Sequence, residues 1–387
     1  MKLKAIVSEA RQPFYLLKGE EKKSGESLNA LFFGKEKSVA YLSDLIYSEE
    51  PSQVYLGKSF VWNVKSKARS VQPEPDAILV DFNRIYAHIL KRQGFLIIPK
   101  WVLFTLDISK PMPTLMEEVK NDSLDNNLRR MNKLDFSFDI TRDLDKFDFF
   151  YHRMYLPLAE KRFGNRAWIF EYHRIKRLLE NGCLLLIKLN NEYLAGALLL
   201  ERGKHLFSHS LGVKDGDKKY VEQGAVTATY YFTIQWAIDQ GYEEIEFGYS
   251  RPFLRDGVFI YKKRWGMTVK NQDRSMVWGG YGLRIQHYTK STRSFLTENP
   301  FIFVDGDKIK GLMLIEQKEP LTEKNVRRFM RIQYIKGLDG VIILSPHGFT
   351  PEAREMAKDQ YPDLLHLAEM DVEVFFDGLS KLENRRI

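Results

Sequence analysis

Residues 241–269 carry the side chains of this sequence that are best suited to chemistry. They hold an expected strand, EEIEFGYS, and then a short basic helix that ends at Trp265-Gly266. Glu246 on the strand could act as a general base, and Tyr249 at the strand end could donate a proton. Lys262 on the helix could neutralise the charge that develops on an oxyanion. The three consecutive cations Lys262, Lys263 and Arg264 suggest a site that holds phosphates.

Each of these side chains also has a purely structural interpretation. Lys262, Lys263 and Arg264 could form a solvated face of the helix. Glu246 could pair with a nearby Lys or Arg, which is a common arrangement for a carboxylate on a strand. Tyr249 could pack with only its hydroxyl at the rim of the fold. The residue types alone therefore leave both interpretations open.

The elements around this segment alternate between strands and helices. Residues 183–213 predict three strands joined by tight turns at Asn190-Asn191 and Arg202-Gly203. Residues 224–241 predict a helix that ends at a glycine. The predicted order over residues 183–270 is three strands, a helix, a strand, a helix and a strand.

Two histidines and the single cysteine lie within these expected strands. His205 and His209 alternate along the third strand with Phe207 between them. Two imidazoles on one face could bind a metal ion, but no third ligand is evident, so we predict no metal site; they could line a cleft instead. Cys183 opens an apolar run and is expected to be a buried, unreactive thiol.

The order of elements over residues 183–270 resembles the core of the GNAT acyltransferase fold, and more closely its FemAB-type branch. The resemblance covers about residues 111–284. Its motifs are the helix start Gln223-Gly224-Ala225, the strand end Glu246-Phe247-Gly248, the segment Tyr261-Lys262-Lys263-Arg264-Trp265-Gly266, and upstream the basic run LRRMNK at residues 128–133. It implies an α/β (α+β) fold with a mixed sheet flanked by helices, in which two parallel strands separate to leave a cleft for an acyl donor.

The resemblance also implies an activity and a set of site residues. The expected reaction moves an acyl or aminoacyl group from acyl-CoA or aminoacyl-tRNA to an amine by direct attack, without a metal ion. The implied catalytic residues are Lys262, Glu246 and Tyr249. The implied donor-binding residues are Gln223, Gly224, Ala225, Gly248, Lys263 and Arg264. A helix that begins at Gly224 presents unpaired N–H groups and a positive dipole end, which suit a phosphate.

The sequence departs from the GNAT pattern at two positions. The signature Q/R-x-x-G-x-G/A is absent, and Glu222-Gln223-Gly224-Ala225 keeps only a fragment of it. This suits the FemAB-type branch, which generally uses aminoacyl-tRNA or other acyl donors. GNAT enzymes usually have a tyrosine four residues before the closing glycine. Lys262 occupies that position here, as in FemAB-like proteins, and Tyr261 precedes it.

Residues 285–387 have a second resemblance, to the PD-(D/E)xK nuclease core of the Mrr-like restriction type. Residues 315–318, IEQK, resemble its Glu-x-Lys motif. Counting the register from a turn at Gly306-Asp307 places Glu316 opposite position 297, so Glu298 is the nearest acid. In such a nuclease Glu298 and Glu316 would hold a divalent cation, and Lys318 would stabilise the attacked phosphate.

This resemblance leaves open a protein that cleaves or binds nucleic acid through its C-terminal part. The common occurrence of Glu-x-Lys on strand edges equally allows a nuclease-derived fold used for packing. Arg327, Arg328 and Arg331 on the following helix could contact a phosphate backbone or simply solvate a face. A third alternative is an acyltransferase fold without catalysis that serves as an interaction module.

Length and composition bear on the number of domains, the binding partners and the cellular location. The 387 residues suffice for several domains, and we expect three: residues 1–110 as a degenerate GNAT-like half, residues 111–284 as the acyltransferase domain, and residues 285–387 as a small α/β domain. The net charge of +8 favours contact with polyanions such as tRNA or DNA. Residues 1–19 lack an apolar signal-peptide core, no run is long enough to insert into a membrane, and one cysteine fits a reducing compartment, so we expect a cytoplasmic protein.

Overall fold

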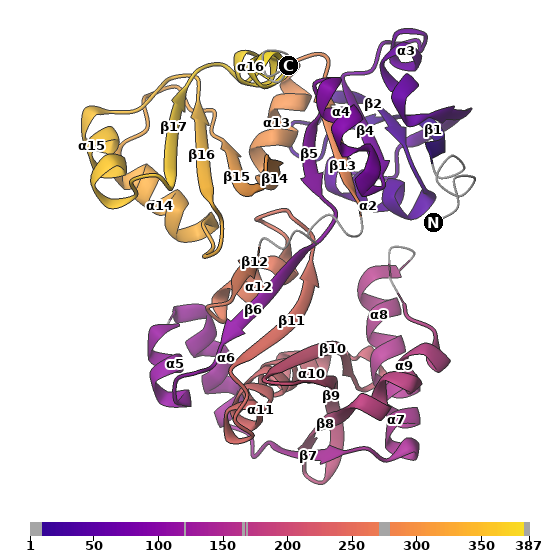
Figure 1. Ribbon diagram of the computed structural model, residues 1–387, viewed down its shortest axis with the longest axis vertical. Helices are drawn as coiled ribbons and strands as arrows, with labels where there is room; N and C mark the ends of the chain where they lie inside the picture. The colour runs from indigo at the N-terminus through magenta and orange to yellow at the C-terminus, as the bar shows by residue number, and fades with distance from the viewer. Residues whose placement is uncertain (1–9, 120, 165–166, 168, 271–278, 383–387) are drawn as a thin grey trace. The chain divides into compact units, whose positions relative to one another are not determined.

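The computed structural model describes residues 10–119, 121–164, 167, 169–270 and 279–382 (Figure 1). The first nine residues, part of the stretch without an apolar signal-peptide core, lie outside this range. The chain forms two compact units. Unit 1 comprises residues 1–102, 250–260 and 269–387, and unit 2 comprises residues 103–249 and 261–268. The chain therefore passes between the units four times.

Unit 1 contains a six-stranded sheet in the order β3-β1-β2-β4-β13-β5. Its strands are β1 (Arg11–Glu20), β2 (Ser27–Phe33), β3 (Ser52–Phe60), β4 (Ala77–Phe82), β5 (Leu96–Pro99) and β13 (Gly280–Ile285). Strand β1 is antiparallel to β2 and β3, β2 is parallel to β4, and β13 is antiparallel to both β4 and β5. The helices of this part are α2 (Glu36–Ile46), α3 (Val64–Arg69) and α4 (Ala87–Arg92).

Unit 1 also contains a four-stranded sheet in the order β14-β15-β16-β17. Its strands are β14 (Phe301–Asp305), β15 (Lys308–Leu314), β16 (Gly340–Ser345) and β17 (Leu365–Glu369). The first two form an antiparallel hairpin, and the remaining neighbours are parallel. The helices are α13 (Lys290–Glu298), α14 (Glu323–Gln333), α15 (Pro351–Gln360) and α16 (Val372–Leu382).

The two sheets of unit 1 share one hydrophobic core. A single buried cluster includes Leu79 and Tyr281 from the six-stranded sheet together with Phe301 and Leu344 from the four-stranded sheet. This grouping differs from the expected segments 1–110, 111–284 and 285–387. The physical reason is non-local pairing, because β13 inserts between β4 and β5 although it lies far from both in sequence.

Unit 2 is built on a seven-stranded sheet in the order β12-β6-β11-β10-β9-β8-β7. Its strands are β6 (Val102–Asp107), β7 (Ser137–Thr141), β8 (Gly182–Leu189), β9 (Glu192–Arg202), β10 (His205–Val213), β11 (Glu244–Ser250) and β12 (Thr268–Lys270). Strands β7 to β10 are antiparallel, and β10 is parallel to β11. The helices are α5 (Met112–Glu118), α6 (Asp122–Asn132), α7 (Leu144–Phe150), α8 (Leu156–Phe163), α9 (Tyr172–Leu178), α10 (Lys218–Gln223), α11 (Ala225–Asp239) and the second half of α12 (Gly257–Arg264), whose residues 257–260 belong to unit 1.

The fold is the expected mixed α/β class, with mixed sheets flanked by helices. The predicted order of elements over residues 183–270 is confirmed, with the short helix α10 added before α11. Asn190 and Asn191 both have positive φ, as a tight two-residue hairpin turn requires. Within the described part of the chain, every helix falls short of the length and apolarity needed to cross a bilayer.

Candidate active site

The parallel strands β10 and β11 pair over only three residues. Residues 205–207 of β10 lie opposite residues 244–246 of β11. Both strands then continue, β10 to Val213 and β11 to Ser250, without further mutual pairing among the described residues. The two strands thus separate along their carboxyl-terminal halves, as the GNAT resemblance implied.

Both strands have an irregular backbone just past their last shared pair. The pairing of β10 with β9 shifts register between Ser208 and Ser210, so His209 is an extra, bulged residue. In β11, Gly248 has a φ of +68°, in the left-handed region that favours glycine. A Cβ atom on Gly248 would lie 3.5 Å from the carbonyl oxygen of Ser208. Because a bulge bends its strand and a left-handed residue redirects the chain, these two features account for the separation.

Lys262 of α12 is held at the end of β11. Its side chain is buried, with 3% of the residue exposed. The Nζ atom donates hydrogen bonds to the carbonyl oxygens of Gly248, at 3.1 Å, and Tyr249, at 3.0 Å. It also lies 5.1 Å from the centre of the Phe104 ring. Two carbonyl dipoles and an aromatic face compensate in part for the hydration that a buried ammonium loses. A solvated helix face is therefore the wrong description of Lys262.

The two cations that follow Lys262 have different environments. Lys263 is half-buried, and burial lowers the pKa of its ammonium to about 8. Arg264 is exposed, and its carbonyl oxygen accepts a hydrogen bond of 2.9 Å from Nδ2 of Asn121. The three cations are thus one buried, one half-buried and one exposed residue, and Arg264 alone fits the expected solvated face.

Glu246 and Tyr249 lie on the same strand but in different surroundings. The carboxylate of Glu246 is 3.3 Å from the guanidinium of Arg202, and one fifth of its side chain is exposed. The structure therefore contains the ion pair that the sequence left open for Glu246. Tyr249 is 38% exposed, and the atom that it turns to Lys262 is its backbone carbonyl oxygen. Phe247 between them stacks on Tyr230 of α11, at 4.9 Å between ring centres.

The start of α11 contains the three predicted residues Gln223, Gly224 and Ala225. Gly224 has a φ of +100° and lies between α10 and α11. A Cβ atom there would be 3.4 Å from the Cα atom of Met131, so glycine meets both a conformational and a steric requirement. Ala225 is fully buried. The Oε1 atom of Gln223 is buried without a hydrogen-bond partner among the described residues, which identifies a polar group that a ligand could satisfy.

Tyr261 lies beside the first turn of α11, a placement that sequence analysis did not predict. Its hydroxyl is 3.4 Å from Oγ1 of Thr227, and its ring packs edge-on against Tyr230. Burial raises the pKa of Tyr261, against smaller opposing effects from hydrogen bonds with Thr227 and Trp265. The sequence feature that could have drawn attention to Tyr261 is its position directly before Lys262 in the segment of residues 261–266.

The two histidines of β10 have different surroundings. Nδ1 of His205 is 3.3 Å from the carboxylate of Glu244. The ring of His209 forms a hydrogen bond of 2.6 Å with Oγ of Ser210, and burial lowers the pKa of His209 to about 4. Among the residues that the structure describes, no group of three or more His, Cys, Asp or Glu could hold a metal ion.

The residues of the nuclease hypothesis do not have the expected register. Pairing in the hairpin ends at Phe301 with Leu312, so it does not extend to positions 297 and 316. Glu298 is the last residue of α13 and pairs with Arg255 at 2.9 Å. Glu316 follows β15 and pairs with Arg293 at 2.9 Å. Placing Glu298 on the strand next to Glu316 was wrong, because the helix replaces the strand at that point. Lys318, the third member of the motif, is exposed.

Comparisons with known proteins give only distant similarities. No family model and no curated protein match the chain. Among solved structures, the crystal structure of FemX is 15% identical over 70% of this chain and 84% of that chain, with a TM-score of 0.37. The structure of L-PGS from Bacillus licheniformis is 10% identical over 72% and 86%, with a TM-score of 0.34. A GCN5-related N-acetyltransferase from Kribbella flavida is 8% identical over 78% and 61%, with a TM-score of 0.27. These scores are low, so we infer function from the geometry of this chain.

Proposed function

We propose that this protein is an N-acyltransferase that moves an acyl or aminoacyl group from a CoA- or tRNA-linked donor to an amine. The observation that carries the proposal is the separation of β10 from β11, with the buried ammonium of Lys262 fixed at the end of β11. Strands that separate inside a sheet leave backbone N–H and C=O groups without their usual partners. An extended donor lying between the strands would satisfy these groups and bring its carbonyl close to Lys262.

The reaction in this proposal is a direct attack. The nitrogen of the acceptor amine forms a bond to the donor carbonyl carbon, and the carbonyl oxygen becomes an oxyanion. The intermediate then breaks the bond to the leaving group, which departs as the thiolate of CoA or a ribose hydroxyl of tRNA. The attacking nitrogen loses a proton, for which Glu246 is the candidate base, and Tyr249 is the candidate donor to the leaving group. Lys262 would stabilise the oxyanion from a preorganised position.

The phosphate-bearing part of the donor would bind at the start of α11. Gly224 and Ala225, which we assign to donor binding, lie at the first turn of α11, whose N–H groups lack acceptors within the helix. The unpartnered Oε1 of Gln223 lies next to this turn; as an acceptor, it would bind an N–H or O–H of the donor and not a phosphate oxygen. Lys263 and Arg264 on α12 are the further cations that we assign to donor binding. The nuclease alternative has no comparable support, because Glu298 and Glu316 are each paired with a different arginine.

The first test is donor binding to the full chain. We expect one donor class among acetyl-CoA, longer acyl-CoAs and charged tRNA to raise the melting temperature and to give a calorimetric dissociation constant, with uncharged tRNA as the control for binding that does not involve the acyl group. Gln223→Leu should weaken that donor about threefold to tenfold, through loss of the hydrogen bond that Oε1 would accept from an N–H or O–H of the donor. Absence of binding by every donor would overturn the proposal and favour an interaction module without catalysis.

The second test is transfer itself, measured by release of the donor's leaving group with a panel of amines. Lys262→Met should lower the rate by about 10²-fold or more, because it removes a preorganised charge at the oxyanion. Lys290→Met is the matched control, since the Lys290 side chain is 71% exposed and belongs to unit 1. Circular dichroism of both variants separates loss of chemistry from loss of folding. Wild-type rates in Lys262→Met would contradict the assigned role.

A further inference from the structure

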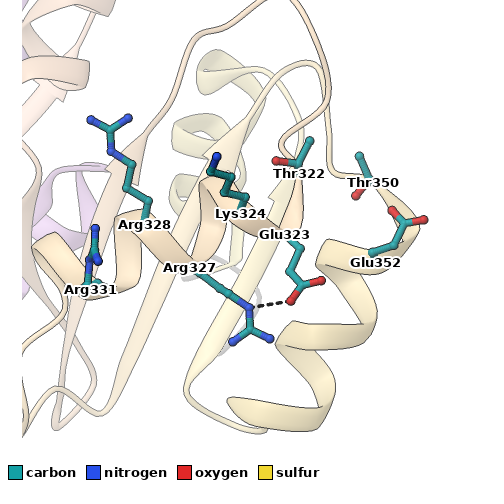
Figure 2. A pocket seen from close by; sticks show the side chains of 8 residues that line it. All are labelled: Thr322, Glu323, Lys324, Arg327, Arg328, Arg331, Thr350 and Glu352. Atoms are coloured by element: carbon teal, nitrogen blue, oxygen red, sulfur yellow. Dashed lines mark hydrogen bonds and ion pairs between the residues drawn. The ribbon is translucent and has the colours of Figure 1, made fainter.

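A hollow in unit 1 is lined by residues of α14 and by the start of α15 (Figure 2). Its volume is about 650 Å³. Four of its eight lining residues are cations and two are carboxylates, so positive charge is in excess. The lining residues are Thr322, Glu323, Lys324, Arg327, Arg328, Arg331, Thr350 and Glu352.

Three of the cations form a stripe along α14. Lys324, Arg328 and Arg331 are spaced at i, i+4 and i+7, which places them on one face of the helix. At a rise of 1.5 Å per residue the stripe is about 10 Å long. Figure 2 shows these three side chains extending to one side of α14 and Arg327 to the other. We call Lys324, Arg328 and Arg331 the basic stripe.

Lys324 and Arg328 of the basic stripe differ from Arg327 in how their charge is compensated. Arg327 donates to the carboxylate of Glu323 at 2.6 Å and to Oε1 of Gln360 at 2.5 Å, so it serves the packing of α14 against α15. Lys324 and Arg328 have no ion-pair partner among the residues that the structure describes. Uncompensated cations on one face repel one another, and an external anion would relieve that repulsion.

The ends of two helices add to the positive field at the hollow. Both α14 and α15 begin there, with Thr322 accepting a hydrogen bond from the N–H of Asn325 and Thr350 accepting one from Ala353. The N-terminus of a helix carries a partial positive charge. Consistent with this field, hydrogen bonds from its own backbone N–H and from Thr350 lower the pKa of Glu352.

The shape and charge of the basic stripe indicate that its ligand is a polymeric anion. Val326 and Met330 of α14 are buried in the protein, and Ile332 is the exposed large apolar side chain of this helix, so α14 has no continuous apolar face to insert into a bilayer. The stripe lies along an exposed helix, and its length of about 10 Å spans about three phosphates of one nucleic-acid strand at 3.4 Å each. We propose that the basic stripe binds the phosphodiester backbone of a nucleic acid without reading its sequence.

The test uses the full chain and labelled oligonucleotides. Fluorescence polarisation would follow binding of a short RNA, a single-stranded DNA and a duplex DNA between about 50 and about 200 mM salt. The triple variant K324Q/R328Q/R331Q should weaken binding about tenfold or more. It should also reduce the slope of log K against log salt by about 2 for single strands and about 3 for a duplex. The charge-keeping variant K324R/R328K/R331K should restore both.

A matched control variant distinguishes the effect of losing the basic stripe from the effect of lowering the net charge. The variant K67Q/R69Q/R92Q removes the same number of charges from exposed positions of unit 1 and should bind as the wild type does. A preference between the RNA and DNA arms would identify the natural polymer. The proposal is overturned if the stripe variant keeps wild-type affinity, if the control loses as much, or if the stripe supports binding to anionic phospholipid vesicles and to no oligonucleotide.

Discussion

The ammonium of Lys262 lies 3.1 Å from the carbonyl oxygen of Gly248, a residue whose φ is +68°. This hydrogen bond joins α12 to β11 where β11 leaves its parallel neighbour. The backbone of β11 thus helps to position the buried cation. A substitution at Gly248 should therefore affect the site in two ways, by displacing Lys262 and by altering the backbone of β11.

Gly248→Ala should destabilise the protein because it forces a Cβ atom into the left-handed region. We expect the free energy of unfolding to fall by about 1–2 kcal/mol, measured by urea denaturation. The steric contribution is small, since the new Cβ would lie at an ordinary 3.5 Å from Ser208. Gly257→Ala is the control, because Gly257 has no neighbour within 4 Å and no left-handed φ. Equal losses in the two variants would contradict the conformational explanation.

Lys263 should make stability rise with pH above about 8. Burial lowers its pKa to about 8 from the usual 10.5. Between these two values the unfolded chain binds the proton and the folded chain does not, so raising the pH favours folding. Lys263→Met should remove this contribution, so the unfolding free energy should change less between pH 7 and pH 10 than it does in the wild type. Lys308→Met, at an exposed position, should keep the wild-type dependence. If the unfolding free energies of wild type and Lys263→Met change with pH in parallel, a lowered pKa of Lys263 in the folded protein is excluded.

Glu246 and Arg202 offer a way to separate an ion pair from a catalytic base. Arg202 is more than half exposed, so their pair should contribute at most about 1 kcal/mol to stability. A double-mutant cycle with Glu246→Gln and Arg202→Gln would measure that contribution. If Glu246 is the base, Glu246→Gln should lower transfer by about 10²-fold or more, and Arg202→Gln should not. If Glu246→Gln and Arg202→Gln lose the same amount of transfer rate, Glu246 has a structural role and is not the base.

Cys183 should be unreactive in the folded protein. The residue is fully buried, and burial raises the pKa of its thiol to about 12. At pH 8 its thiolate fraction, and with it the rate of disulfide exchange with an aromatic disulfide reagent, should be about 10³-fold below that of a free thiol. One thiol should react per chain in denaturant. Rapid reaction under native conditions would show that β8 opens readily.

The local elements of unit 2 could be predicted from sequence because their signals are short-range. Alternation of apolar residues marked β11, and Ile245 and Phe247 are indeed buried. The asparagine pair marked the hairpin between β8 and β9, and Gly224 marked the start of α11. Each signal depends on backbone preferences or on one face of one element. The separation of β10 from β11 entered only as an implication of family resemblance.

Other features could not be predicted because they depend on contacts between distant segments. The burial of Lys262 depends on Phe104, which belongs to a strand more than a hundred residues earlier. Register counting around the hairpin failed at Glu298, because a Thr289 cap begins a helix that ends where the strand was expected. Gln223 was predicted as a binding residue, but the unsatisfied state of its amide is a property of packing alone.

The position of β13 has a consequence for any attempt to dissect the protein. A fragment that stops at residue 110 would keep β4 and β5 but lose the strand that joins them. Both strands would then expose unpaired edges over apolar residues, a template for intermolecular pairing. Such a fragment should aggregate on expression, and an equivalent soluble piece should require residues 280–285 supplied in trans or fused by a short linker. The middle of the chain can thus be regarded as an insertion within a domain that both ends of the sequence build together.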